Sequence, residues 1–209
     1  MIKILKKEWV QLATQFSADI NLIESYWIEI EKQYSLKIRH YHNLSHIQNM
    51  LSLSEIVRDS IIDHTSFLFA IWYHDIIYKP TRKDNEEKSA ILAEKRLKTL
   101  NIDEKSSKTI YNLIISTKKH EIILAEHKDN ALLLDIDLSI LGSDWDTYQN
   151  YIQNIRKEYA MYPNFMYKKG RKKVLHHFLE RKTLYFTEVF QNKFEEQARQ
   201  NLLKEIELL

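Results

Sequence analysis

Residues 67–78 read FLFAIWYHDIIY, an apolar stretch that carries one adjacent pair of ionisable side chains, His74 and Asp75. A run of this kind is typical of a segment that is buried on most sides. Burying a charge is costly unless the charge is paired or binds a metal ion. Because an imidazole beside a carboxylate is a favourable ligand pair for a divalent cation, the stretch predicts a metal site in the core.

The composition favours helices over strands. The chain of 209 residues contains only two glycines and two prolines, whereas β-rich folds need many tight turns. We therefore expect an all-α fold, a single-domain helical bundle of about eight to ten helices over residues 1–209, with a helical extension over about 144–209 packed on the core. Apolar periodicity predicts helices over residues 6–17, 21–35, 43–58, 64–79, 86–100, 104–120, 128–141, 144–161, 167–181 and 184–207.

Several classes of chemistry and location are disfavoured. Without cysteine the chain has no disulfide, thiol nucleophile or thiolate metal site, and with so few glycines it has no glycine-rich phosphate loop. A net charge of +2 with interspersed signs disfavours nucleic acid as a partner, although it leaves a local basic patch open. No apolar run approaches the ~20 residues of a membrane span, and the charged N-terminus does not resemble a signal peptide. We expect a cytoplasmic protein without a membrane partner.

Two further ligand-type residues lie in apolar settings. Asp137 has leucine or isoleucine at all four helically adjacent positions, and His46 begins an apolar stripe that continues through Met50. Taken singly, a core histidine with one hydrogen bond or an aspartate that caps a helix explains each residue. Together with His74 and Asp75 they come from three separate segments, which predicts a divalent-metal site in a helical bundle.

The order His46, His74-Asp75, Asp137 resembles the H…HD…D signature of the HD superfamily of metal-dependent phosphohydrolases. The flanking segments are similar to a predicted bacterial HD phosphohydrolase subfamily: RHYHNLSH at 39–46, WYHDIIY at 72–78, DNEEKSA at 84–90, LDIDLSILG at 134–142, RKEY at 156–159 and ARQNL at 198–202. The similarity covers most of the chain.

This resemblance implies a divalent ion held by His46, His74, Asp75 and Asp137, with Mn, Fe, Co, Ni, Zn and Mg equally compatible. It also implies a hydrolase that acts on a nucleotide or another small phosphoester, with a metal-bound water as the nucleophile. Asp135 is the main rival to Asp137. Its helical neighbours include a serine, so we expect it behind the ligands or facing solvent.

Hydrolysis also needs cations for the phosphate and groups that handle protons. Arg39 and Arg156 are the first choices for phosphate because both lie in the family-like segments. His120 is a candidate general acid or second-ion ligand, against the alternative of a cation that complements a helix C-terminus. Glu86 resembles a catalytic or water-positioning carboxylate, against a first-turn acid near a helix start. Weaker cation candidates are Lys88, Lys118, Lys119 and Arg171.

The remaining histidines are predicted to have less direct roles. His42 precedes His46 by four residues, so it either faces the same cavity or makes a hydrogen bond at a helix start, which we favour slightly. We assign structural roles to His127, His176 and His177.

Two other functions remain open. A di-iron HD-type oxygenase would need at least two further ligands, which His120 with His42 or Glu86 would supply. A non-catalytic, metal-stabilised module would bind a nucleotide without turnover. The long terminal helix and exposed aromatic residues also suggest a homodimer.

Overall fold

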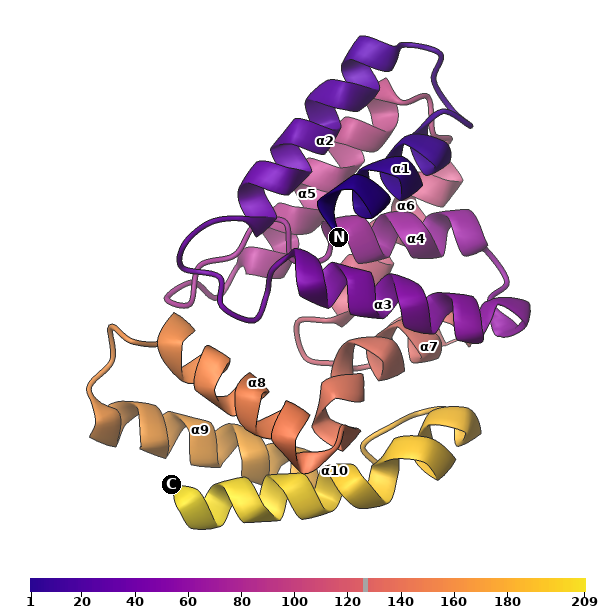
Figure 1. The fold of residues 1–209 in the computed structure, drawn as a ribbon. Coiled ribbons are helices and arrows are strands. Elements are labelled where there is room, and N and C mark those ends of the chain that lie inside the picture. Colours follow the sequence, from indigo (N-terminus) through magenta and orange to yellow (C-terminus); the bar gives the residue numbers. More distant parts are fainter. Residues whose placement is uncertain (126–127) are drawn as a thin grey trace. The chain divides into compact units, whose positions relative to one another are not determined.

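The computed structural model describes residues 1–125 and 128–209. Within these residues it contains ten α-helices, two short 3₁₀ helices and no strand (Figure 1), which confirms the all-α prediction. In that described part, no helix is both long and apolar enough to cross a membrane. The chain forms two compact units, residues 1–133 and 134–209, and the division falls inside one helix.

The first unit is organised around one buried helix, α4 (His64–Tyr73), in which seven of ten residues are buried. It packs against α3, α5 and α6, and α1 packs on α2. The other elements of this unit are α1 (Ile2–Ala13), α2 (Ile20–Tyr34), α3 (Leu44–Ile56), the 3₁₀ helix η1 (Arg58–Ser60), α5 (Asn85–Thr99), α6 (Glu104–Ser116) and the first part of α7 (Lys128–Asp137).

Aromatic rings hold the N-terminal helices to α4. Trp9 of α1 is edge-on to Phe69, Trp72 and Tyr73, with ring centroids 6.0, 5.9 and 6.0 Å apart. Its indole N–H donates to the carbonyl oxygen of Ile23 in α2 at 3.1 Å. Because edge-to-face rings add to the free energy of burial, this one tryptophan ties α1, α2 and α4 together.

The helix ends follow their sequence signals with one exception. Asn101 ends α5 in the left-handed region with φ of 63°, and the Ile102 N–H donates back to the Leu97 carbonyl at 3.0 Å. Asp84 and Glu87 have the spacing of a capping box at the start of α5, but neither carboxylate caps the helix. Asp84 pairs with Arg82 and Lys88, and Glu87 pairs with Lys118.

The second unit is built around the long C-terminal helix α10 (Glu188–Leu208). This helix packs against η2 (Leu138–Gly142), α8 (Trp145–Glu158) and α9 (Asn164–Leu179). Gly142 lies at the end of the helical segment, as a C-terminal capping glycine would, but its φ is not positive. It is required for space instead, because a Cβ there would lie 2.6 Å from both the Cβ and the carbonyl oxygen of Phe194 in α10.

Gly142→Ala is therefore expected to lower the free energy of unfolding by ~1–3 kcal/mol, because the added methyl group meets α10 backbone that must shift. Gly170→Ala is the matched control. Gly170 lies in helix α9 with no atom within 4 Å of an added Cβ. The control should raise the unfolding free energy by up to ~1 kcal/mol through helix propensity. Urea unfolding of both variants tests this, and equal effects would contradict the packing argument.

Candidate metal centre

The His74-Asp75 pair lies at the end of α4 and not within it. The helix was expected to run to residue 79 but ends at Tyr73, with His74 as its C-terminal cap. The Arg39 guanidinium donates to the carbonyl oxygens of Asp75 at 2.7 Å and Ile76 at 2.8 Å. Those carbonyls bind an arginine instead of helical N–H groups. The chain therefore turns here, and Asp75 lies outside the helix.

Arg39 is itself a buried structural residue. It is 5 % exposed and donates a further hydrogen bond to the His42 carbonyl oxygen at 3.0 Å. Its guanidinium carbon lies 4.8 Å from the ring centroid of Tyr34 and 5.3 Å from that of Tyr78. The guanidinium of Arg39 thus holds the backbone of the site, and phosphate binding by Arg39 stays a prediction.

Residues of α5 hold the rest of the same turn. The Ser89 hydroxyl accepts from the Ile77 N–H at 3.0 Å and donates to the Ile77 carbonyl at 3.3 Å. The Asn85 side chain contacts Lys79 in the same way: its carbonyl oxygen accepts from the Lys79 N–H at 3.1 Å, and its amide N–H donates to the Lys79 carbonyl at 3.0 Å. Buried backbone polar groups need such partners, so residues 75–79 are fixed by side chains from two distant segments.

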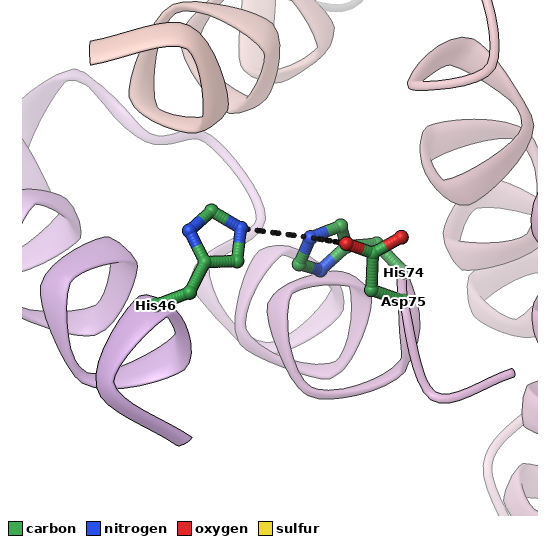
Figure 2. Close-up of side chains that lie close together, drawn as sticks. All are labelled: His46, His74 and Asp75. Atoms are coloured by element: carbon green, nitrogen blue, oxygen red, sulfur yellow. Dashed lines mark hydrogen bonds and ion pairs between the residues drawn. The ribbon is translucent and has the colours of Figure 1, made fainter. Parts of the chain in front are cut away.

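Three predicted ligands come together in the first unit (Figure 2). His46, from the buried face of α3, places its Nε2 3.2 Å from the His74 Nε2, and the Asp75 Oδ2 lies 3.4 Å from that same His74 nitrogen. One ligand atom from each residue lies within 4.8 Å of the others. His46 and His74 are 4 % and 1 % exposed, so both imidazoles are removed from bulk water.

The tautomer of His74 follows from its second nitrogen. Nδ1 lies 2.9 Å from the carbonyl oxygen of Ile71. A carbonyl only accepts, so Nδ1 carries a proton, and Nε2, which carries the lone pair when the ring is neutral, faces His46 and Asp75. A backbone carbonyl behind a metal-binding histidine fixes its tautomer and orientation in this manner.

Two more polar residues lie beside Asp75. The His42 Nε2 is 3.9 Å from the Asp75 Oδ2, and its ring stacks on Tyr78 with centroids 4.4 Å apart. Glu86, in the first turn of α5, has a pKa raised by burial, and the charge of Asp75 adds to the rise. The structure thus places His42 beside the cluster. From the sequence, a hydrogen-bonding role at a helix start had been slightly favoured over this position. It also places Glu86 within electrostatic range.

The donor set fits a divalent cation. Two imidazole nitrogens and a carboxylate are borderline ligands suited to Mn, Fe, Co, Ni or Zn. The neighbouring carboxylates Asp75 and Glu86 repel each other, and a bound cation would relieve that repulsion.

The fourth predicted ligand belongs to the second unit. Asp137 is half-buried at the end of α7. Burial raises the pKa of the Tyr151 phenol, and the charge of Asp137 contributes to that rise, so the two side chains are electrostatic neighbours. Ligation by Asp137 stays a prediction.

Asp135 has a structural role. Its side chain is fully buried and accepts from the N–H of Phe186 at 2.7 Å, the N–H of Thr187 at 2.8 Å and the Thr187 hydroxyl at 2.6 Å. Burial raises its pKa to about 6, although these hydrogen bonds oppose the shift. Of the two expected positions, behind the ligands or facing solvent, the solvent-facing one is wrong, because Asp135 is buried and anchors the start of α10.

Arg156 also holds backbone groups. It donates to the carbonyl oxygens of Tyr159 at 2.9 Å and Tyr162 at 3.1 Å and to the Asn164 side chain at 2.7 Å, and it lies over the Tyr167 ring. Its guanidinium fixes the connection between α8 and α9, and phosphate binding by Arg156 stays a prediction.

The weaker candidates for binding the phosphate lie in different surroundings. The Arg171 side chain is 10 % exposed, and its Nε lies 2.7 Å from the Glu205 Oε1. This pairing excludes Arg171 as a surface phosphate ligand. Lys88 pairs with Asp84, Lys119 is exposed, and Lys118 pairs with Glu87. The charge of Lys118 also acts on Glu86, so Lys118 lies within electrostatic range of the cluster.

Of the other histidines, His120 is half-buried in the turn after α6 with φ of 50°, and the following N–H, of Glu121, donates to the Ser116 carbonyl at 3.3 Å. It is not part of the three-residue group found in the described residues. Its catalytic role stays a prediction. His176 and His177 are exposed on α9, and His127 lies outside the described residues.

Comparisons with protein-family models, curated proteins and solved structures found no significant match to this chain.

Arg39→Lys should weaken metal binding by about 10–100-fold, because a lysine cannot hold two carbonyls in the fixed fork geometry and the turn carrying Asp75 loosens. Arg96→Lys is the control, since it disrupts a similar bidentate contact with Glu29. Calorimetric titration with Co²⁺, together with circular dichroism to verify folding, measures both. Equal affinities in a folded Arg39→Lys protein and the wild type would contradict the positioning role.

Proposed function

We propose that this chain is a metal-dependent phosphohydrolase that acts on a nucleotide or another small phosphoester. The observation that carries the proposal is the orientation of His74. Its Nδ1 proton is committed to the Ile71 carbonyl, so Nε2, which carries the lone pair in the neutral ring, faces the His46 nitrogen and the Asp75 carboxylate in a buried cluster. Such a lone pair needs an electrophile or a proton, and a divalent cation suits all three groups.

His46, His74 and Asp75 would hold the ion, and Asp137 is proposed as the fourth ligand. When bound, such an ion lowers the pKa of a water molecule and polarises a phosphoryl oxygen. The order of these four residues, with the segments around them, supports phosphoester hydrolysis over other metal chemistry.

Neighbouring side chains would supply the remaining functions. Glu86 lies near Asp75 and is raised in pKa by burial, so its carboxylate is suited to orient the attacking water and to accept its proton. With Arg39 and Arg156 committed to backbone carbonyls, Lys118 is the cation we place toward the phosphate, because its charge already acts on Glu86. His42 lies 3.9 Å from the Asp75 Oδ2, the same oxygen that faces His74, and would hold that carboxylate in position.

The test combines metal content with turnover. Wild-type protein and His176→Ala, whose imidazole is exposed on α9, should both contain stoichiometric metal and release phosphate from members of a nucleotide and phosphomonoester panel. His74→Ala and Asp75→Asn should lose both, because the first removes an imidazole nitrogen from the cluster and the second replaces its anionic carboxylate with a neutral amide. Elemental analysis and metal-reconstituted phosphate-release assays provide the two readouts.

The outcomes separate the competing functions. Metal without phosphate release, accompanied by tight nucleotide binding, would overturn the hydrolase in favour of a binding module. Two irons and oxygen consumption would favour the oxygenase. Metal that persists in folded His74→Ala would show that the ion binds elsewhere and would contradict the centre itself.

A further inference from the structure

The positive charge of this nearly neutral chain is concentrated in one segment. Residues 159–179 contain four lysines, one arginine and two histidines but no acidic residue, which leaves 26 basic and 29 acidic residues in the rest of the chain. Most of this segment is α9. A local excess of this size creates an electrostatic surface that the net charge of +2 does not reveal.

Helix α9 has sharply different faces. Tyr167 and Leu175 are buried at 8 % and 0 %, and the Arg171 side chain between them pairs with Glu205. Exposed residues at helical spacing occupy the opposite face. They are Phe165, Met166, Lys169, Lys173, His176 and His177. The outward face is therefore basic along its length and apolar at its start.

The apolar start of this surface is unusually exposed. Met161, Phe165 and Met166 are 60 %, 74 % and 49 % exposed, and we call these three residues the apolar tip. Arg156 holds the connection just before α9 through the carbonyl oxygens of residues 159 and 162. The tip thus projects from a well-anchored turn, and exposed bulky side chains in a group indicate an interaction surface.

Whether the exposed cations are lysines or arginines indicates which class of anionic partner this surface fits. Both nearby arginines, Arg156 and Arg171, donate to groups inside the unit, so the exposed cations of α9 are lysines. Nucleic-acid surfaces favour arginine, whose planar fork matches phosphate groups and base edges. Lysines beside methionine and phenylalanine instead match an interface with anionic lipid, where lysine acts as a point charge and apolar side chains insert.

The same charges disfavour a second copy as the partner. In a two-fold dimer through this face, the lysines of one copy would meet the identical lysines of the other. A partner with a negatively charged surface would attract these lysines, so no such repulsion arises.

We propose that α9 docks this protein on anionic membrane surfaces. The apolar tip enters the headgroup region, and Lys169 and Lys173 of the outward face lie against anionic lipid headgroups. This is peripheral docking, in keeping with the lack of a spanning helix in the described residues. It departs from the sequence-based expectation of no membrane partner, and it does not depend on the proposed phosphohydrolase activity.

Vesicle co-sedimentation tests the proposal with the full chain. Wild-type protein should bind vesicles of phosphatidylcholine mixed with phosphatidylserine, and binding should fall with added salt. Lys169→Glu with Lys173→Glu should reduce the partition coefficient at least about tenfold, since each lysine near an anionic surface contributes about fivefold. Phe165→Ser with Met166→Ser should reduce it as well, through loss of insertion.

Matched controls come from the first unit. Lys105→Glu with Lys108→Glu makes the same charge change on exposed α6 positions, and Ile28→Ser with Ile91→Ser removes apolar side chains that are 60 % and 57 % exposed. Both controls should bind vesicles more tightly than their α9 counterparts, and all variants should remain folded by circular dichroism.

Three results would overturn the proposal. One is absence of wild-type binding to anionic vesicles, and another is equal losses in the control and α9 variants. The third is binding of a single-stranded oligonucleotide through the same lysines without vesicle binding, which would assign the surface to nucleic acid.

Discussion

The candidate site depends on one buried arginine. The Arg39 guanidinium holds the carbonyl oxygens of Asp75 and Ile76, which stops α4 after Tyr73 and turns the chain. If α4 continued as a helix, His74 and Asp75 would point in directions about 100° apart around its axis. By ending the helix between them, Arg39 allows an imidazole from the helix end and a carboxylate from the turn to meet the same neighbour, His46.

Support for this turn comes from parts of the chain far apart in sequence. Arg39 precedes α3, which carries His46, while Ser89 and Asn85 belong to α5 and hold Ile77 and Lys79. The Nδ1 contact of His74 is made within α4 itself. Ligand orientation is thus determined mainly by hydrogen bonds to backbone groups, an arrangement that keeps a metal site in place before the ion binds.

Apolar periodicity was sufficient to predict the ten helices and an all-α fold, because buried helices repeat their pattern locally. It also singled out His46, His74 and Asp75, whose polarity conflicts with their surroundings. The early end of α4 was missed because its cause lies 36 residues away along the chain. The hydrogen-bond partners of Arg156 and Arg171 were not predicted for a related reason: sequence shows the charge of a long side chain but not the direction in which it points. The proximity of His42 to Asp75 depends on the same unpredicted turn.

The measurement that tests the central claim most directly is anomalous diffraction from crystals grown with Co²⁺. The account predicts a peak at coordination distance from the Nε2 atoms of His46 and His74 and from the Asp75 carboxylate, with the His74 Nδ1 still bonded to Ile71. A cobalt peak elsewhere, with none at these three residues, would contradict it. The two imidazoles would then form a hydrogen-bonded core pair, and the chain would have no metal centre at this position.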